Sequence, residues 1–398
     1  SSSVTGVQTC ALPILPGAYE TRLRAGTAAQ PVPFIGWFYV FMLSIVLSVV
    51  INLPNPLQVV VGSKNLIALW SVYLIIALGA VHQERVEKLF SWLFPLAMLQ
   101  LPFVLYQYFI VAAGRSNRGG RYGVSWDAIV GSFGGDPNSG GASGVMVFFL
   151  AAAMLLAFTF LRAGLIRQWA VAAIVGVAAF CIGLAEVKVI VVLLPIGMAV
   201  IMLPEMLKRP LMALVSMVLV LAAMLALLYL YDDLHYATAG YGAKSLGDLL
   251  DSAFGYSLDP DYVNLETGEL GRVAALVLWW RDGFLADPVH GLFGYGPGAS
   301  RSVSNFAVGE VAAKYPFYID RSAACQLLWD IGLCGFLGMT LFLLSAAKTA
   351  YQLANKCNMP SNTKAFLQFS SAVLVLQILM LPYGRDLLEV PAQTFFMF

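Results

Sequence analysis

Long runs of apolar residues divide the chain, and they constrain its fold more than any other feature. They cover residues 33–53, 66–81, 89–113, 145–161, 169–185, 189–204, 210–231, 322–346 and 365–383. About 17 to 25 apolar residues in a helix cross a hydrocarbon core of about 30 Å. Hydrophobic residues make up 60% of the chain and charged residues 11%, which leaves too few polar groups to cover a water-facing surface. The sequence therefore predicts an all-α polytopic membrane protein with about nine helices.

Lysines and arginines fall in alternate loops, which sets the expected orientation of these helices. The basic groups are Arg22 with Arg24, Arg85 with Lys88, Arg162 with Arg167, Lys208 with Arg209, and Lys348 with Lys356 and Lys364. Short cytoplasmic loops carry an excess of such residues, so we assign this side to the cytoplasm. The opposite side then holds the loop 114–144, the tip 186–188 and the long segment 232–321, which carries twelve of the 22 acidic residues.

Both ends of the chain are expected to lack native sequence. The chain begins at Ser1 without a methionine, and residues 4–14 (VTGVQTCALPI) resemble translated sequencing adapter. Residues 1–32 are therefore predicted to be non-native or disordered, with a native extension as the alternative. The expected order continues with membrane helices 1–7 over 33–231, a periplasmic loop over 232–321, and helices 8–9 over 322–398. The last four residues begin a further apolar segment that the chain does not complete.

The external loop 115–144 combines three arginines with many glycines. Arg115, Arg118 and Arg121 contradict the positive-inside rule, so either the topology differs locally or the arginines serve a purpose on that side. Glycines permit close backbone approach, Asp136 and Asn138 flank a turn proline, and guanidinium groups match phosphate oxygens. The pattern predicts an anionic ligand, although a solvated connecting loop is an equal alternative.

Ionisable residues within or beside the apolar runs are further candidates, because such groups are costly in a membrane. Lys64 opens the second run, and Glu186 and Lys188 interrupt the nearly continuous apolar stretch 169–204 as the tip of a hairpin. Helix ends and snorkelling explain the two lysines. Glu186 and Asp330 are each expected to pair with an arginine of an external loop.

The segment 271–302 carries the most distinctive pattern in the long loop. The apolar block 273–280 lies between Arg272 and Arg281 and is too short to span, so we expect an amphipathic helix near 272–285 at the outer interface. Its tryptophans, Trp279 and Trp280, are expected at headgroup depth. The two arginines are nine residues apart, which places them on opposite faces and about 13 Å apart along the axis. They are therefore not expected to hold one phosphate together.

Residues 287–302 add a turn and a histidine to this segment. Asp287 and Pro288 are predicted to end the helix, and three alternating glycines from Gly294 to Gly298 with Pro297 predict a rigid turn. His290 could act as a general base because its pKa lies near neutrality. A histidine that is simply hydrogen-bonded in a turn is the alternative.

Several classes of function are disfavoured by what the sequence lacks. The alternating glycines follow no strand, and no P-loop is present, so nucleotide binding and ATP-driven transport are not expected. Five cysteines form no C-x-x-C pair, which predicts neither a disulfide framework nor a zinc site, and no cofactor or other metal is expected. A net charge of +1 gives no support for binding to nucleic acid.

Together these residues resemble the O-antigen ligase and polysaccharide polymerase superfamily of bacterial inner-membrane proteins. The resemblance rests on Gly271, Arg272, Trp279 or Trp280, Pro288, Gly291, Gly294, Gly296, Pro297 and Gly298, and on Leu328 to Gly335 in the next helix. The Lys64 segment and Gly134 to Asn138 are similar too, so it spans about residues 33–398. It implies a GT-C-like helical bundle, metal-independent glycosyltransferase activity and contact with other proteins of envelope polysaccharide assembly.

The resemblance also implies a reaction and roles for residues. An oligosaccharide would pass from undecaprenyl diphosphate to the hydroxyl of an acceptor glycan at the periplasmic face. The catalytic candidates are Arg272, Arg281 and His290; the candidates for substrate binding are Lys64, Arg115, Arg118, Arg121, Asp136, Asn138, Glu186, Lys188, Arg301, Arg321 and Asp330. Ligases usually carry His-Asn or His-Ser before the eighth helix, and this chain has Arg321-Ser322, which favours a polymerase over a ligase. A transporter or lipid flippase, and a structural membrane subunit, are the alternatives of other classes.

Overall fold

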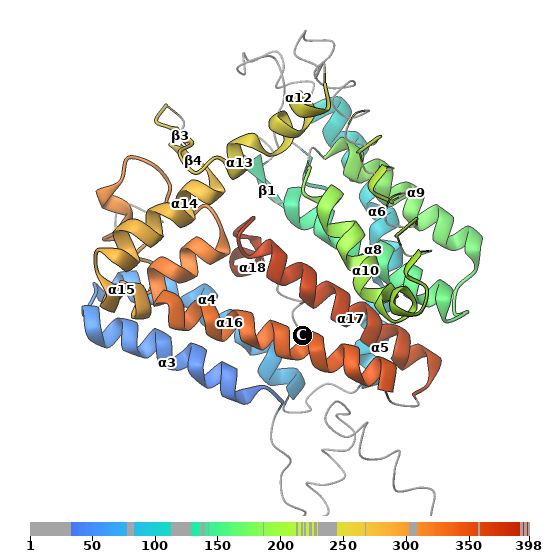
Figure 1. Cartoon of the computed structure of the whole chain (residues 1–398), viewed down its shortest axis with the longest axis horizontal. Coiled ribbons are helices and arrows are strands. Elements are labelled where there is room, and N and C mark those ends of the chain that lie inside the picture. The colour runs from blue at the N-terminus through green and yellow to red at the C-terminus, as the bar shows by residue number, and fades with distance from the viewer. Residues whose placement is uncertain are drawn as a thin grey trace, which may run out of the picture. The chain divides into compact units, whose positions relative to one another are not determined.

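In the residues that it describes, the computed structural model of the chain is mostly helical (Figure 1). It describes residues 33–77, 83–112, 129–136, 140–141, 143–185, 187–211, 214–215, 218, 220–222, 225–226, 229, 245–266, 268–301, 309–356, 359–390, 393 and 396. In this part of the chain, seven helices have the length and composition to cross a membrane. An eighth, Gln168–Leu184, is apolar but shorter. The protein is therefore an all-α protein with several membrane-spanning helices, as predicted.

Eight of the nine apolar runs coincide with these helices, and the ninth, 210–231, is described only in part. The prediction was wrong at the start of the second helix. This helix, α4 (Pro56–Ala77), begins ten residues before position 66, so Lys64 lies inside it with an exposed side chain. Its polar first half escaped the hydropathy pattern because Gln58 and Ser63 are buried against protein, at 3% and 8% exposed, and need no lipid-compatible side chain.

The chain divides into two compact units. Unit 1 contains residues 81–250 and 347–376, and unit 2 contains residues 19–80, 251–346 and 377–398. Two long helices, α16 (Ala323–Lys356) and α17 (Ser361–Met380), contribute residues to both. The described strands form two short antiparallel hairpins, β1 (Gly135–Asp136) with β2 (Gly140–Gly141) and β3 (Val263–Asn264) with β4 (Glu269–Leu270).

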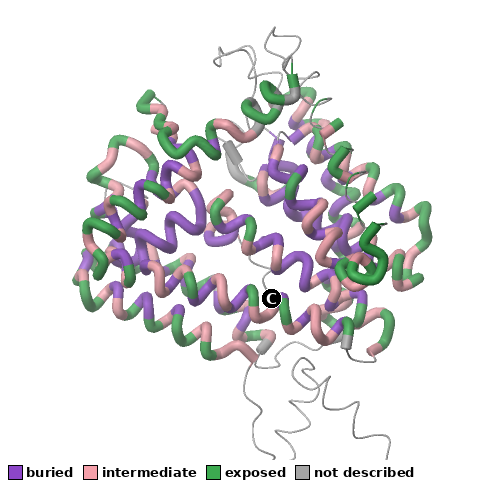
Figure 2. The backbone as a smooth tube through the Cα atoms, in the orientation of Figure 1, coloured by how far each residue is buried: buried purple, intermediate pink, exposed green. Residues whose placement is uncertain are grey.

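Unit 1 is built around α8 (Ser143–Arg162). Its neighbours are α6 (Leu93–Tyr106), which continues as the π-helical η1 (Gln107–Ala112), α9 (Gln168–Leu184) and α10 (Ile190–Lys208); α5 (Gln83–Ser91) precedes α6, and α12 (Leu246–Leu250) follows. Residues 145–157 of α8 are all buried (Figure 2). A helix that is apolar on every face and buried on every face is the central helix of a membrane bundle, because the outer helices shield it from lipid.

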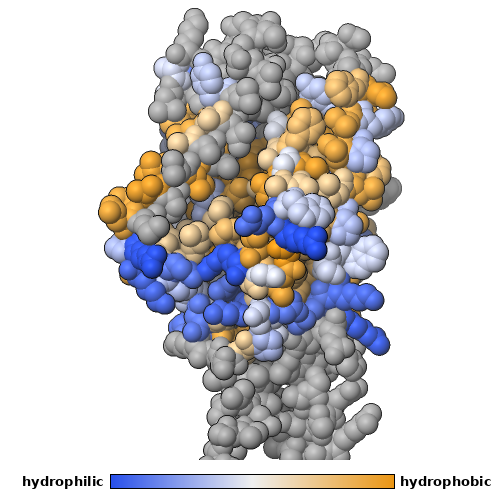
Figure 3. Space-filling model, turned by 90° about the vertical axis from the view of Figure 1, so that its right-hand side faces the viewer, coloured by the Kyte–Doolittle hydropathy of each residue, from blue (hydrophilic) through white to orange (hydrophobic). Residues whose placement is uncertain are grey.

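The basic residues of unit 1 gather where its helix ends meet. Arg162, in the last turn of α8, donates to the carbonyl of Ile201 at 3.1 Å and pairs with Glu205 in the last turns of α10. Asn362, at the start of α17, donates to Glu87 in α5 at 2.5 Å. These contacts join the end of α8 to that of α10, where Lys208 lies, and join α5, with Lys88 in its last turn, to the start of α17, which carries Lys364. Figure 3 shows apolar side chains exposed beside a band of hydrophilic ones. That the helix ends with these basic residues face the cytoplasm stays a prediction.

Unit 2 packs α3 (Ile35–Asn52) and α4 against the first half of α16. Trp70 of α4 is fully buried and lies 5.2 Å from the ring of Phe41 in α3 and 4.8 Å from that of Phe342 in α16. α16 runs antiparallel to α3, since Gly338 faces Phe41 whereas the earlier Asp330 bonds to the later Ser48. The three helices thus form one aromatic-rich core.

The part of unit 2 that follows residue 250 supplies a compact cap of short elements. These are the π-helical η3 (Asp251–Gly255), α13 (Tyr256–Leu258), the β3–β4 hairpin, α14 (Arg272–Leu278), the π-helical η4 (Trp279–Leu285), α15 (Pro288–Phe293), the 3₁₀ turn η5 (Ala312–Lys314) and, after α17, α18 (Asp386–Glu389). Residues 272–285 are thus helical. Trp279 was expected at headgroup depth, but it is 5% exposed and its indole donates to the Leu328 carbonyl at 3.1 Å, so only Trp280, 50% exposed, presents its ring outward.

Candidate functional site

The predicted glycine turn is present, and it packs directly onto membrane helices. Gly294, Gly296 and Gly298 have φ angles of 76°, 103° and 80°, which only glycine adopts readily. A methyl group at Gly294 would lie 2.5 Å from the carbonyl carbon of Asp330, and one at Gly298 would lie 3.1 Å from the carbonyl oxygen of Gln58. The glycines are therefore needed both for the turn and for close contact between backbones.

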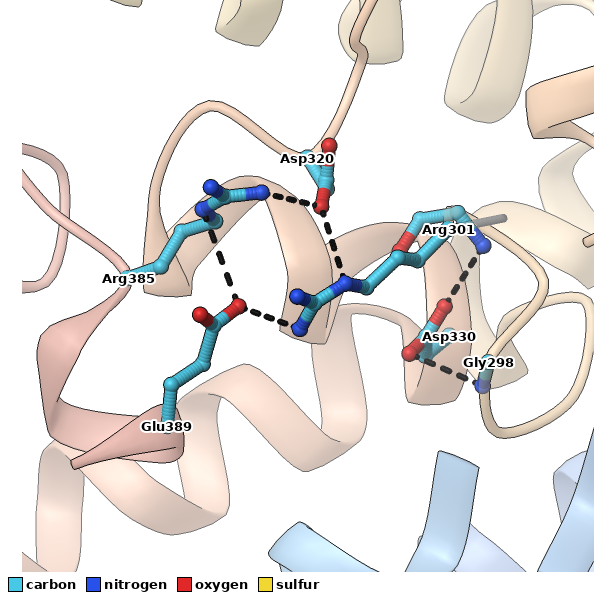
Figure 4. A network of polar contacts seen from close by, with 7 residues as sticks. Gly298, Arg301, Asp320, Asp330, Arg385 and Glu389 are labelled. Carbon is cyan, nitrogen blue, oxygen red and sulfur yellow. Dashed lines mark hydrogen bonds and ion pairs between the residues drawn. The ribbon is translucent and has the colours of Figure 1, made fainter. Parts of the chain in front are cut away.

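Asp330 fixes this turn through both its side-chain carboxylate and its backbone carbonyl. Its carboxylate accepts the backbone N–H of Gly298 at 3.0 Å and that of Ser300 at 2.9 Å, and the side chain is fully buried (Figure 4). Its carbonyl oxygen accepts the hydroxyl of Ser48 at 2.7 Å and the N–H of Gly296 at 3.0 Å. The expected pairing with an arginine was wrong: two backbone amides satisfy the buried carboxylate instead. Asp330 therefore positions a loop and has no exposed atom for a substrate.

Replacing Asp330 by alanine is expected to lower the free energy of unfolding by about 2–4 kcal/mol, because two buried amide donors would lose their acceptor. The matched control is Asp261→Ala, which removes an exposed carboxylate and is expected to cost less than about 0.5 kcal/mol. Unfolding of the purified protein in detergent measures both. Equal losses in the two variants would contradict this role of Asp330.

The turn leads into a cluster of two arginines and two acids, which we call the charged cluster: Arg301, Asp320, Arg385 and Glu389 (Figure 4). Asp320 Oδ2 lies 2.7 Å from Arg385 Nη1 and 3.9 Å from Arg301 Nε. Glu389 Oε1 lies 2.5 Å from Arg301 Nη1 and 3.6 Å from Arg385 Nε. Each acid therefore contacts both guanidinium groups.

Burial within the charged cluster is uneven. The side chain of Asp320 is 3% exposed, whereas those of Arg301 and Arg385 are 31% and 37% exposed. Burial alone would lower the pKa of Arg385, but Asp320 and Glu389 outweigh it and raise the pKa. Asp320 thus holds both guanidiniums from the inside, and both are partly open to the outside.

Backbone contacts between two membrane helices bring the charged cluster together. The N–H groups of Ala323 and Ala324, at the start of α16, donate to the carbonyls of Gly384 and Leu381 at 2.9 and 2.8 Å. The first amides of a helix lack partners within it, so the segment that leaves α17 satisfies them. Arg385 follows Gly384 directly and is thereby fixed beside the residues that precede α16.

Two further arginines lie along the same segments. Arg272 donates from Nε to the carbonyl of Tyr383 at 2.6 Å and from Nη1 to the hydroxyl of Tyr256 at 2.9 Å, and its guanidinium lies 4.0 Å from the centre of the Tyr383 ring. Arg321 lies 3.6 Å from Glu269, and its buried Nε has no hydrogen-bond partner in the described part of the chain. The segment 381–389 therefore contacts Arg272 and also carries Arg385 and Glu389.

The two other catalytic candidates do not join this group. Arg281 is 68% exposed and pairs with its neighbour Asp282 at 2.6 Å. This contact lowers the pKa of Asp282, and burial together with Asp282 raises the pKa of Tyr315 to about 12. His290 Nδ1 lies 2.5 Å from Asp287 Oδ2, and the histidine ring stacks on that of Tyr295 at 4.4 Å.

The hydrogen bond from His290 lowers the pKa of Asp287, whose carboxylate also accepts the His290 backbone N–H at the start of α15. The contact at Nδ1 directs Nε2 away from the aspartate. None of the contacts of His290 within the described residues is with Arg272 or Arg281. The expected spacing of these two arginines stays a prediction, and the sequence did not reveal the contacts of His290 with Asp287 and Tyr295.

The remaining candidates for substrate binding lie in other segments of the chain. Arg115, Arg118, Arg121, Asn138 and Glu186 lie outside the described residues, as does the segment 1–32. The backbone of Asp136 pairs with Gly140 in the β1–β2 hairpin, in keeping with a turn between them. Lys188 lies in the turn before α10. Within the described part of unit 2, no contact brings Lys64 to the charged cluster.

Sequence reasoning missed three members of the charged cluster: Asp320, Arg385 and Glu389. One available signal was the position of Arg385, which follows the last described membrane helix on the side opposite to the basic loops. The same departure from the positive-inside rule drew attention to Arg115, Arg118 and Arg121, and it applies equally to Arg385.

The chemistry that this region offers is recognition of an anion by forked guanidinium donors. Within the described residues no group of three or more His, Cys, Asp and Glu side chains could hold a metal ion. Comparison of the chain with protein-family models, curated proteins and solved structures gives no match.

Proposed function

We propose that the protein is a membrane-embedded glycosyltransferase of the polysaccharide polymerase type with a GT-C-like bundle. It transfers an oligosaccharide from undecaprenyl diphosphate to the hydroxyl of an acceptor glycan at the periplasmic face of the bacterial inner membrane. The observation that supports this most is the pair of partly exposed guanidiniums, Arg301 and Arg385, which the buried Asp320 holds at the ends of membrane helices.

The negative charge of a lipid-linked diphosphate lies at the membrane surface, close to the ends of membrane helices. Its hydrocarbon chain lies among lipids, and its phosphates lie at the membrane surface beside the ends of spanning helices. Arginine forks bind phosphate oxygens with two parallel hydrogen bonds, and their geometry here is fixed before any ligand arrives. These properties favour Arg301 and Arg385 as the ligands of the diphosphate.

The reaction itself also requires cations beside the diphosphate. The bond between the anomeric carbon and the diphosphate oxygen breaks, the acceptor oxygen bonds to that carbon, and the electron pair leaves with the diphosphate. Preorganised cations stabilise the charge that develops on this leaving group. Arg272 and Arg321, adjacent along the same segments, extend the cationic surface in this proposal.

A proton acceptor for the acceptor hydroxyl completes the proposal. His290 keeps this role, because Asp287 orients its ring and directs Nε2 away from the aspartate. The acceptor glycan would then extend from the charged cluster to α15. Arg281 is exposed and paired with Asp282, so it takes no part in diphosphate binding in this proposal.

The full-length protein in lipid nanodiscs, supplied with repeat units linked to undecaprenyl diphosphate, is expected to produce a ladder of glycans that differ by one repeat unit. Gel electrophoresis of the products measures this, and boiled protein is the control. Transfer of a single glycan to a lipid core would select the ligase alternative. Movement of intact substrate across the bilayer without new glycosidic bonds would select the flippase and exclude the proposed reaction.

A further inference from the structure

The two acids of the charged cluster occupy different kinds of position. Asp320 is 3% exposed and contacts both arginines from the protein side. Glu389 is 22% exposed and lies at the end of the four-residue α18. A single oxygen, Glu389 Oε1, lies between Arg301 Nη1 and Arg385 Nε, which is where a phosphate oxygen bound to both guanidiniums would lie (Figure 4).

The Glu389 side chain can leave this position without any movement of the backbone. Leu387 and Leu388, the two preceding residues, are 1% and 4% exposed and anchor α18 in the protein. A glutamate side chain has three rotatable bonds, and this one is already partly in contact with solvent. Release of the carboxylate therefore requires only a change of rotamer.

The net charge of the cluster changes with this movement. With Glu389 in place, two arginines face two carboxylates and the net charge is zero. With Glu389 rotated away, two arginines face Asp320 alone, and the net charge is +1. Asp320 keeps the guanidiniums in position in both states, because it is buried and contacts each of them.

We propose that Glu389 is an internal occupant of an oxyanion site formed by Arg301 and Arg385, and that a phosphate group of the ligand replaces it. The identification of this ligand as a lipid-linked diphosphate rests on the proposed function. Glu389 keeps the two cations paired when the site is empty. It also competes with the bound diphosphate, so that it speeds release of the carrier after transfer.

The test measures binding of inorganic pyrophosphate and of farnesyl diphosphate to the full-length protein in nanodiscs by isothermal titration. In Glu389→Gln the site loses its charged competitor, and both probes are expected to bind about tenfold more tightly than to the wild type. Arg301→Ala and Arg385→Ala are each expected to weaken binding at least about tenfold. Glu205→Gln, which neutralises the partner of Arg162 in unit 1, is the matched control and is expected to leave both affinities unchanged.

Two results would overturn the inference: equal affinity in Glu389→Gln and the wild type, or binding that survives loss of either arginine. Tighter binding of farnesyl diphosphate alone would assign the site to a lipid-linked ligand, whereas equal gains for both probes would assign it to the diphosphate group itself. Either of these gains supports the internal occupant. If the gains occur and no glycan ladder forms, the proposed polymerase activity fails and the oxyanion site stands.

Discussion

Replacing Arg385 by alanine is expected to lower the rate of glycan transfer about a hundredfold, because one preorganised donor to a developing negative charge typically contributes that much. Arg385 contacts Asp320 at 2.7 Å and Glu389 at 3.6 Å, so its loss also removes one of the two guanidiniums of the proposed diphosphate site. Initial rates of ladder formation from a lipid-diphosphate donor measure the effect. The variant Arg385→Lys, which keeps the charge without the fork, is expected to retain only part of the activity.

A matched arginine elsewhere separates this effect from general damage to the protein. Arg162 also pairs with a glutamate, but it belongs to unit 1, where it donates to the carbonyl of Ile201. Arg162→Ala is expected to change the transfer rate less than about twofold, in line with the small effects of exposed ion pairs. Similar losses in the two alanine variants, or full activity in Arg385→Ala with unchanged thermal stability, would remove Arg385 from the mechanism.

Replacing Gly332 by alanine is expected to lower the free energy of unfolding by about 3 kcal/mol or more. Gly332 lies within α16 with φ 70° and ψ −175°, a conformation that costs other residues energy. An added methyl group would also lie 2.5 Å from the backbone nitrogen of Gly294, which donates to the carbonyl of His290. Strain and overlap therefore add at one position. Reversible unfolding in mixed detergent micelles measures the loss.

Gly176 provides the control for this substitution. It lies in α9, its φ is not positive, and an added methyl group would meet no atom within 4 Å. Gly176→Ala is expected to leave stability unchanged or to raise it by about 0.5–1 kcal/mol, because alanine favours the helix. Equal effects at the two glycines would mean that the kink in α16 relaxes without cost.

The sequence predicted the membrane helices well, because lipid imposes a length and a polarity on each of them. It was wrong where protein replaces lipid as the surroundings. Gln58 and Ser63 made the start of α4 look like a loop, although they are buried against protein. Trp279 looked like an interfacial residue, but it too is buried against protein.

The candidate site was harder to predict. Asp330 was recognised as unusual, but its partners are backbone amides, which no pattern of side chains reveals. Arg301 and Glu389 are separated by 88 residues, and Asp320 and Arg385 by 65, so only the folded chain brings them together. The glycine turn could be predicted because its requirement is local. The charged cluster could not, because it depends on where α17 ends relative to the start of α16.

The contacts between the glycine turn and the first two helices also bear on how the protein is made. Ser48, Asn52 and Gln58 bond to residues 248, 242 and 239 positions later in the chain. At ordinary rates of translation this interval is on the order of tens of seconds. During that time α3 and α4 are in the membrane with polar groups whose final partners have not been synthesised. Assembly of unit 2 is therefore a late event, and a ribosome stalled before residue 294 would leave these helices open to membrane quality control.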